Sequence, residues 1–86
     1  MEKRAEPRLS IRGAAMLTVL SGAGETCPAE MVNLSGRGMQ ILVGGPLPAG
    51  APVRLDATDC MWLGEVCYCQ PVQDGYVVGL RLDQFL

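Results

Sequence analysis

The chain has 86 residues, which is enough for one small domain but too short for two hydrophobic cores. It contains no histidine, so it lacks the commonest general base and the commonest metal ligand, and the sequence shows no P-loop and no nucleophile–base pair. With a net charge of −2, 49% hydrophobic residues, 11 glycines and 6 prolines, it is predicted to be a globular, turn-rich, non-catalytic protein without a metal site.

The sign of the charge changes along the chain. Residues 1–12 carry a local charge of +2, from four cations and two acids: Lys3, Arg4, Arg8 and Arg12 against Glu2 and Glu6. The rest of the chain holds three arginines against seven acids. Positive charge gathered in one arm suits a compact anion better than a long nucleic acid, which usually meets a basic face.

Short apolar runs separated by glycine- and proline-rich turns predict strands throughout the chain and no helix. In chain order the expected strands are residues 9–20, 25–32, 39–43, 53–57, 61–70 and 76–82. The dipeptide Asp74-Gly75 favours a tight hairpin between the last two strands. Residues 33–38 and 44–50 are expected to be loops, because both segments are rich in glycine or proline.

These elements predict an all-β fold, a six-stranded antiparallel barrel. Residues 1–86 are interpreted as one domain, with a flexible ligand-binding arm over residues 1–8 and the barrel over residues 9–82. The core is expected to hold the single tryptophan, the inward residues of the cleanly alternating strand and most of the methionines: Trp62, Val53, Leu55, Ala57, Met16, Met31, Met39 and Met61.

The four cysteines are Cys27, Cys60, Cys67 and Cys69. The start of the chain is charged, so no signal peptide is visible, and no apolar run approaches the roughly 18 residues of a membrane span. We therefore expect a cytoplasmic protein whose thiols are reduced, buried and structural. In a regular strand Cys67 and Cys69 would share one face, and their spacing does not favour zinc.

Two polar motifs are the candidates for a ligand site. Arg4-Ala5-Glu6-Pro7-Arg8 places two arginines four residues apart, and Asn33-Leu34-Ser35-Gly36-Arg37-Gly38 is a small polar turn between apolar runs. Arginine offers forked donors for phosphate and a flat face for bases, and a glycine-rich turn offers hydrogen bonds at close approach. Each motif alone is also typical of a solvated tail or a simple Asx turn. Together they predict a site for a small anionic ligand that carries bases.

In these residues the chain resembles the PilZ domain family, whose members bind cyclic di-GMP. Arg4 and Arg8 match the family's RxxxR motif at the start of its barrel. Asn33, Ser35 and Gly38 match its [D/N]xSxxG motif, which lies between the second and third strands of the family's barrel. The strand pattern is also similar further along, so the resemblance spans nearly the whole chain, including residues 63–66 and 76–80.

The resemblance implies a cyclic di-GMP receptor or adaptor in bacterial second-messenger signalling, without a cofactor, whose arm closes over the ligand and whose bound form is read by a downstream protein. The implied ligand-binding residues are Arg4, Arg8, Asn33, Ser35, Gly38, Lys3 and Gly36. Arg8 is expected at a phosphate and a guanine edge, and Arg4 at the opposite guanine. Gly38, or Gly36 in its place, is expected to take a positive φ or to let the ligand approach closely.

The chain departs from the family's pattern in two places. Lys3 stands where many members carry a further arginine; it keeps the charge but lacks the planar fork, which leaves open whether one or two ligand molecules bind. Only four residues follow Leu82, so the C-terminal helix of many members is expected to be missing or truncated.

Two other functions remain open on the sequence. The first is a PilZ-like adaptor that binds only protein and no nucleotide. The second is an unrelated barrel that binds single-stranded nucleic acid, but four aromatic residues and a pI near 4.9 argue against it. We expect neither a nucleic-acid polymer nor membrane insertion.

Overall fold

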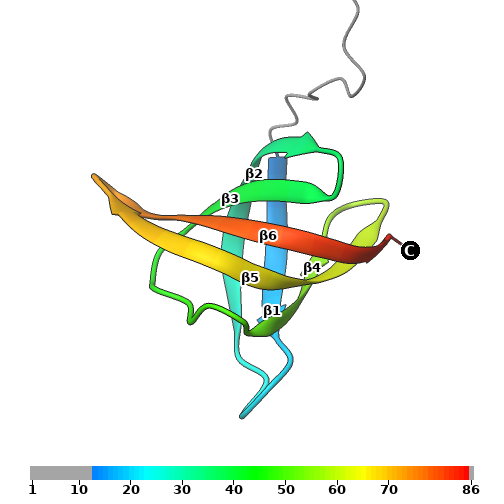
Figure 1. The fold of residues 1–86 in the computed structure, drawn as a ribbon, viewed down its shortest axis with the longest axis horizontal. Helices are drawn as coiled ribbons and strands as arrows, with labels where there is room; N and C mark the ends of the chain where they lie inside the picture. Colours follow the sequence, from blue (N-terminus) through cyan, green and yellow to red (C-terminus); the bar gives the residue numbers. More distant parts are fainter. Residues whose placement is uncertain (1–12, 86) are drawn as a thin grey trace, which may run out of the picture.

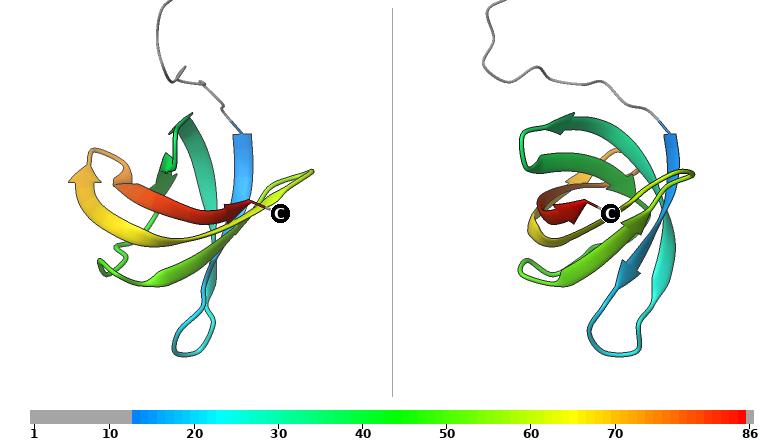
Figure 2. Two further views of the ribbon diagram at one scale, coloured as in Figure 1. Left: turned by 45° about the vertical axis from the view of Figure 1, so that its right-hand side comes forward. Right: turned by 90° about the vertical axis from the view of Figure 1, so that its right-hand side faces the viewer.

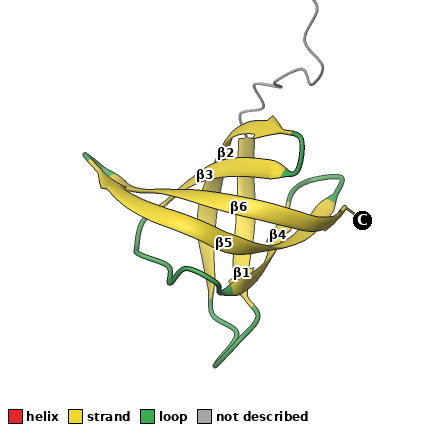
Figure 3. Ribbon diagram, viewed as in Figure 1, coloured by secondary structure: helices red, strands yellow, loops and turns green. Residues whose placement is uncertain are grey.

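The protein is an all-β barrel, as the sequence predicts. The computed structural model describes residues 13–85 of the chain. They form six strands: β1 (Gly13–Val19), β2 (Thr26–Ser35), β3 (Gly38–Val43), β4 (Pro52–Asp56), β5 (Met61–Val72) and β6 (Gly75–Phe85). Figure 3 shows only strands and loops over this part of the chain. It therefore contains no helix that could cross a membrane.

The strands close on themselves in the order β1-β2-β3-β6-β5-β4, and β4 pairs back with β1. Every pair is antiparallel and each strand pairs with two neighbours, although β5 beyond Val66 pairs with β6 alone. The β5–β6 hairpin, which turns at Gln73–Asp74 as Asp74-Gly75 predicts, reaches well beyond the barrel (Figure 1). The right-hand view of Figure 2 looks at the barrel from the opposite side, where β6 ends.

One hydrophobic core fills the barrel. The least exposed large side chains come from five of the six strands: Leu17, Met39, Ile41, Val53, Leu55, Val66 and Val78. Trp62 is buried as predicted, and so are Met31 and Met39. The prediction is wrong for Met16, which is 44% exposed because Leu17, its neighbour in β1, takes the inward position.

The strand pairing has three register shifts; one leaves Asp83 of β6 as an extra residue, and the other two are β-bulges that turn polar or aromatic side chains outward. In β2, Met31 pairs with Ile41 but Asn33 pairs with Gln40, so Val32 is an extra residue. Met31 faces the core, and without the bulge Asn33 and Ser35 would face it too. The extra residue turns them to the outside. The prediction of a loop from residue 33 is wrong, because Asn33–Ser35 belong to β2 and only Gly36 and Arg37 form the turn.

The second bulge lies in β5. Val66 pairs with Leu80 and Tyr68 pairs with Gly79, so Cys67 is the extra residue. Val66 is buried, and the bulge turns Tyr68, two residues later, to the outside. The same bulge separates Cys67 from Cys69. The expected shared face for this pair is therefore wrong: Cys67 is exposed, whereas Cys69 packs against the core.

The expectation of fully buried thiols is also wrong, although all four cysteines are free. Cys27, Cys60 and Cys69 are half-buried. The backbone N–H of Leu47 points at Cys69 Sγ over 3.5 Å. Burial raises the pKa of the Cys27 thiol, because desolvation disfavours the thiolate.

Candidate functional site

A groove with polar and apolar lining residues lies on the outer wall of the barrel, across β2, β3, β5 and β6. Its volume is about 540 Å³. We call it the outer groove; it is lined by Asn33, Ser35, Arg37, Gly38, Met39, Gln40, Cys67, Tyr68, Gly79, Leu80 and Arg81. Two segments far apart in the sequence, residues 33–40 and 67–81, therefore share one surface.

The structure places the predicted site residues in three different ways. Asn33, Ser35 and Gly38 all line the outer groove. Gly36 lies in the adjoining turn and lines a different cavity at the open end of the barrel. Lys3, Arg4 and Arg8 lie outside the described residues.

The β-bulge at Val32 is the reason that the motif in β2 can form a site. Asn33 and Ser35 point outward, opposite Gln40 and Gly38 of β3. Leu34 between them packs against the core. A strand that alternates regularly from Met31 would bury the two polar side chains, so the bulge is a requirement for the groove.

A chain of side-chain hydrogen bonds joins β2, β3 and β5 and passes over β6, which lies between β3 and β5. Asn33 Nδ2 donates to Gln40 Oε1 over 2.7 Å, and Gln40 Nε2 donates to the Tyr68 hydroxyl oxygen over 2.8 Å. Because Asn33 uses its NH₂ group for Gln40, its Oδ1 is left as an acceptor for another group. The bonds also hold Tyr68 in one position.

Tyr68 lies over a glycine of the neighbouring strand. Gly79 is its direct cross-strand partner in β6, and a Cβ atom added at Gly79 would overlap the Tyr68 ring. Gly79 is buried although it points away from the core, because the ring covers it. The exposed side of Tyr68 then offers the groove a flat aromatic face, and 38% of the residue is accessible.

The formal charges that line the groove are both positive, although the whole chain is acidic. They belong to Arg37 in the β2–β3 turn and to Arg81 in β6. Arg81 forms ion pairs with Glu65 at 3.1 Å and with Asp83 at 3.9 Å. These pairs are solvent-exposed and weak, so an anionic ligand can compete for the Arg81 guanidinium.

The turn between β2 and β3 is held in place by its backbone. The N–H of Leu82 donates to the carbonyl oxygen of Arg37 over 2.6 Å, which ties the turn to β6. Gly36 has φ 57°, a left-handed conformation that favours glycine. Of the two glycines for which a positive φ or a close approach was expected, Gly36 and not Gly38 has the positive φ. Gly38 is extended in β3 and leaves space at the groove floor.

Sequence reasoning missed Gln40, Tyr68, Gly79 and Arg81 as groove residues. A signal for Tyr68 exists in the hairpin that Asp74-Gly75 predicts. Counting outward from the turn places Tyr68 opposite Gly79, an aromatic residue across from a residue without a side chain. Gln40 and Arg81 alternate with buried neighbours, but nothing in the sequence shows that they lie side by side with Asn33.

The part of the chain that the structure describes is a small closed barrel with a groove on its outer wall that is lined by two arginines. Residues 2–85 match the PilZ domain family, so the chain belongs to that family. The family typically binds cyclic di-GMP and is generally a non-catalytic binding module. A search of curated proteins found no chain similar to this one.

Proposed function

We propose that this protein is a receptor for cyclic di-GMP, and that the dinucleotide binds in the outer groove with Arg4 and Arg8 closing over it. The observation that carries the proposal is that Asn33, Ser35 and Gly38 line one groove together with two arginines, Arg37 in the same turn and Arg81 in β6. A cytoplasmic location and a downstream protein that reads the bound state belong to the same proposal.

The groove offers groups that complement both parts of the ligand. The Oδ1 atom of Asn33 can accept a hydrogen bond from the N–H groups on the edge of guanine, and the Ser35 hydroxyl can donate or accept. The exposed face of Tyr68 can stack on a base, a contact worth roughly 1–3 kcal/mol per base. Arg37 and Arg81 can form charge-assisted hydrogen bonds to the phosphates.

The two motif arginines supply the remaining contacts in this proposal. Arg8 binds a phosphate and a guanine edge, and Arg4 binds the opposite guanine or stacks on its face. Lys3 adds charge without a planar fork. Ordering the arm around the ligand costs free energy, so we expect a dissociation constant in the micromolar range or somewhat lower.

Calorimetric titration with cyclic di-GMP tests the proposal. We expect saturable binding to the full chain, abolished by Arg8→Ala, and the titration also gives the ratio of ligand to protein. Arg54→Ala is the matched control, because Arg54 lies in β4 and pairs with Asp56 over 2.9 Å, outside the groove. Binding that survives Arg8→Ala would contradict the role of Arg8. A flat titration of folded protein would instead favour an adaptor that binds only protein.

A further inference from the structure

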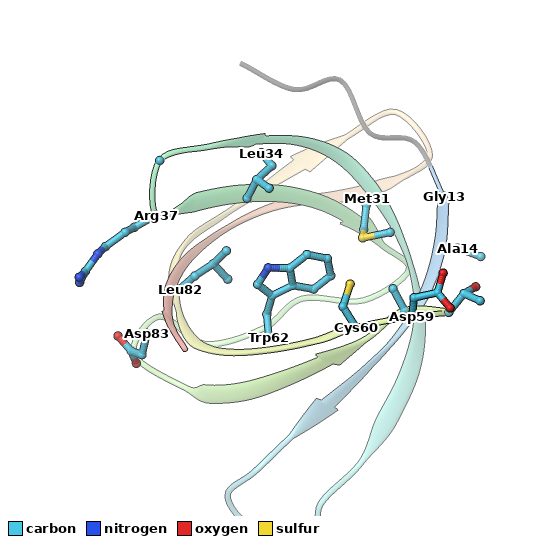
Figure 4. A pocket seen from close by; sticks show the side chains of 13 residues that line it. Gly13, Ala14, Met31, Leu34, Arg37, Asp59, Cys60, Trp62, Leu82 and Asp83 are labelled. Carbon is cyan, nitrogen blue, oxygen red and sulfur yellow. The ribbon is translucent and has the colours of Figure 1, made fainter. Parts of the chain in front are cut away.

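The cavity at the open end of the barrel is larger than the outer groove but less suited to reading the edge of a base. Its volume is about 770 Å³, and Figure 4 shows the Trp62 ring in its middle while the side chains of Arg37 and Asp83 point away at the rim. Met31, Trp62 and Leu82 in its wall are at most 8% exposed. A base edge placed there would meet mainly apolar side chains, so the outer groove is the better place to recognise a base.

One row of residues on the outer wall of the barrel carries the side-chain hydrogen bonds of the outer groove. Asn33 of β2 pairs with Gln40 of β3, and Gln40 pairs with Gly79 of β6. Gly79 in turn pairs with Tyr68 of β5, so the row runs across four neighbouring strands. Because Gly79 has no side chain, the amide of Gln40 can reach over it to the Tyr68 hydroxyl group.

Gln40 lies in the middle of this row and uses both ends of its amide. Its Oε1 accepts from Asn33 Nδ2 over 2.7 Å, and its Nε2 donates to the Tyr68 hydroxyl oxygen over 2.8 Å. Rotating the Asn33 amide alone by half a turn would bring its Oδ1 against Gln40 Oε1, two acceptors with no hydrogen between them. Gln40 therefore holds the Asn33 amide with its oxygen available to a ligand.

We propose that Gln40 is a positioning residue that makes the outer groove select guanine over adenine. The inference rests on the proposed function, because it concerns how the same groove reads the base of its ligand. Gln40 acts through Asn33, whose fixed Oδ1 is only an acceptor. The N1 and N2 positions of guanine carry N–H donors, which Oδ1 can bind. Adenine has no hydrogen on N1, so its lone pair would face Oδ1 without a hydrogen bond.

An asparagine that is free to rotate would discriminate much less between the two bases. Its amide can turn either the oxygen or the NH₂ group toward a base, and asparagine pairs well with adenine when both groups are available. The hydrogen bond from Asn33 to Gln40 removes this choice. Gln40 lies outside both sequence motifs, and its effect on base selection requires no contact between Gln40 and the ligand.

The test compares cyclic di-GMP with cyclic di-AMP, which has the same ring and phosphates and differs in the base. Calorimetric titration of the full chain with each gives a ratio of dissociation constants. In Gln40→Glu the carboxylate still accepts from Asn33, and its charge weakens both nucleotides alike, which cancels in the ratio. In Gln40→Leu the side chain has no hydrogen-bonding group. Gln70→Leu is the matched control, because Gln70 is exposed in β5 and does not line the groove.

We expect the wild-type protein to prefer cyclic di-GMP, and Gln40→Leu to reduce that preference roughly tenfold, which is the scale of one base-edge contact. Gln40→Glu and Gln70→Leu should keep the wild-type ratio within about twofold. A Gln40→Leu variant that binds cyclic di-GMP with the wild-type ratio would overturn the inference and leave the proposed function standing. Folded wild-type protein that binds neither nucleotide would overturn both.

A second measurement contains no nucleotide. By heteronuclear NMR, the hydrogen-bonded Nδ2 proton of Asn33 should exchange with solvent roughly tenfold more slowly in the wild type and in Gln40→Glu than in Gln40→Leu, because only the first two hold the amide. Equal exchange rates in the three proteins would show that Gln40 does not fix Asn33, and would overturn the inference whatever the titrations give.

Discussion

At the residue scale, two glycines of one motif have different tasks. Gly36 has φ 57°, which only glycine adopts without strain, so it is needed for the turn. Gly38 is extended, and a Cβ atom added there would meet its nearest neighbour, the carbonyl oxygen of Ser35, at an ordinary 3.5 Å. Gly38 therefore matters for the open space of the outer groove, whereas Gly36 matters for the backbone.

This difference predicts that replacing glycine by alanine lowers stability at position 36 and weakens ligand binding at position 38. Gly36→Ala should lower the free energy of unfolding by about 1–2 kcal/mol, the cost of a left-handed alanine. Gly38→Ala should change stability by less than about 0.5 kcal/mol, yet weaken cyclic di-GMP binding about tenfold, because its methyl group enters the groove. Urea denaturation and calorimetric titration of both variants check this. Unchanged affinity in Gly38→Ala would show that the ligand does not approach β3 here.

At the element scale, the outer groove depends on the β-bulges at Val32 and Cys67. Each adds one residue to a strand and so reverses the facing of the residues that follow. The first turns Asn33 outward and the second turns Tyr68 outward, and Gln40 on β3 joins the two by hydrogen bonds. The groove is therefore a property of strand pairing, and its residues form no single motif in the sequence.

Removing the bulge residue of β5 tests what the bulge contributes. Deletion of Cys67 should leave Tyr68 facing outward opposite Gly79 and Cys69 facing inward, because Tyr68 then follows the buried Val66 directly in regular alternation. The deletion variant should therefore bind the ligand as well as Cys67→Ser, which keeps the extra residue and an exposed side chain. Denaturant unfolding and titration of the two variants give the comparison. Loss of binding in the deletion variant alone would show that the local twist of the bulge, and not only the facing of Tyr68, shapes the groove.

At the scale of the whole molecule, six strands enclose one core, and closure of the barrel gives each strand in residues 13–85 two paired neighbours. Ile41 is fully buried and contacts a core built from strands on every side. A domain of this size has a free energy of unfolding of only about 5–15 kcal/mol. A single substitution that leaves a cavity in the core is therefore expected to destabilise the whole barrel.

Ile41→Ala should accordingly lower the stability of the entire domain by about 2–5 kcal/mol. Leu20→Ala, which removes an aliphatic side chain that is 49% exposed, should change it by no more than about 0.5 kcal/mol. Thermal unfolding followed by far-UV circular dichroism measures both variants. The wild-type spectrum should be β-rich with little helix. Similar losses in the two variants would mean that Ile41 is not part of a single cooperative core.

Local sequence patterns were enough to predict the strands, the hairpin at Asp74-Gly75 and the inward positions of Val53 and Leu55. They also identified Asn33 and Ser35 as candidates for a site, because turn chemistry, alternation and motif spacing are properties of neighbouring residues. Only the tertiary structure decided that these side chains face outward and that Tyr68 lies over Gly79. The reason is that a bulge is defined by the partner strand, and the strands that meet at the groove are paired across long stretches of sequence.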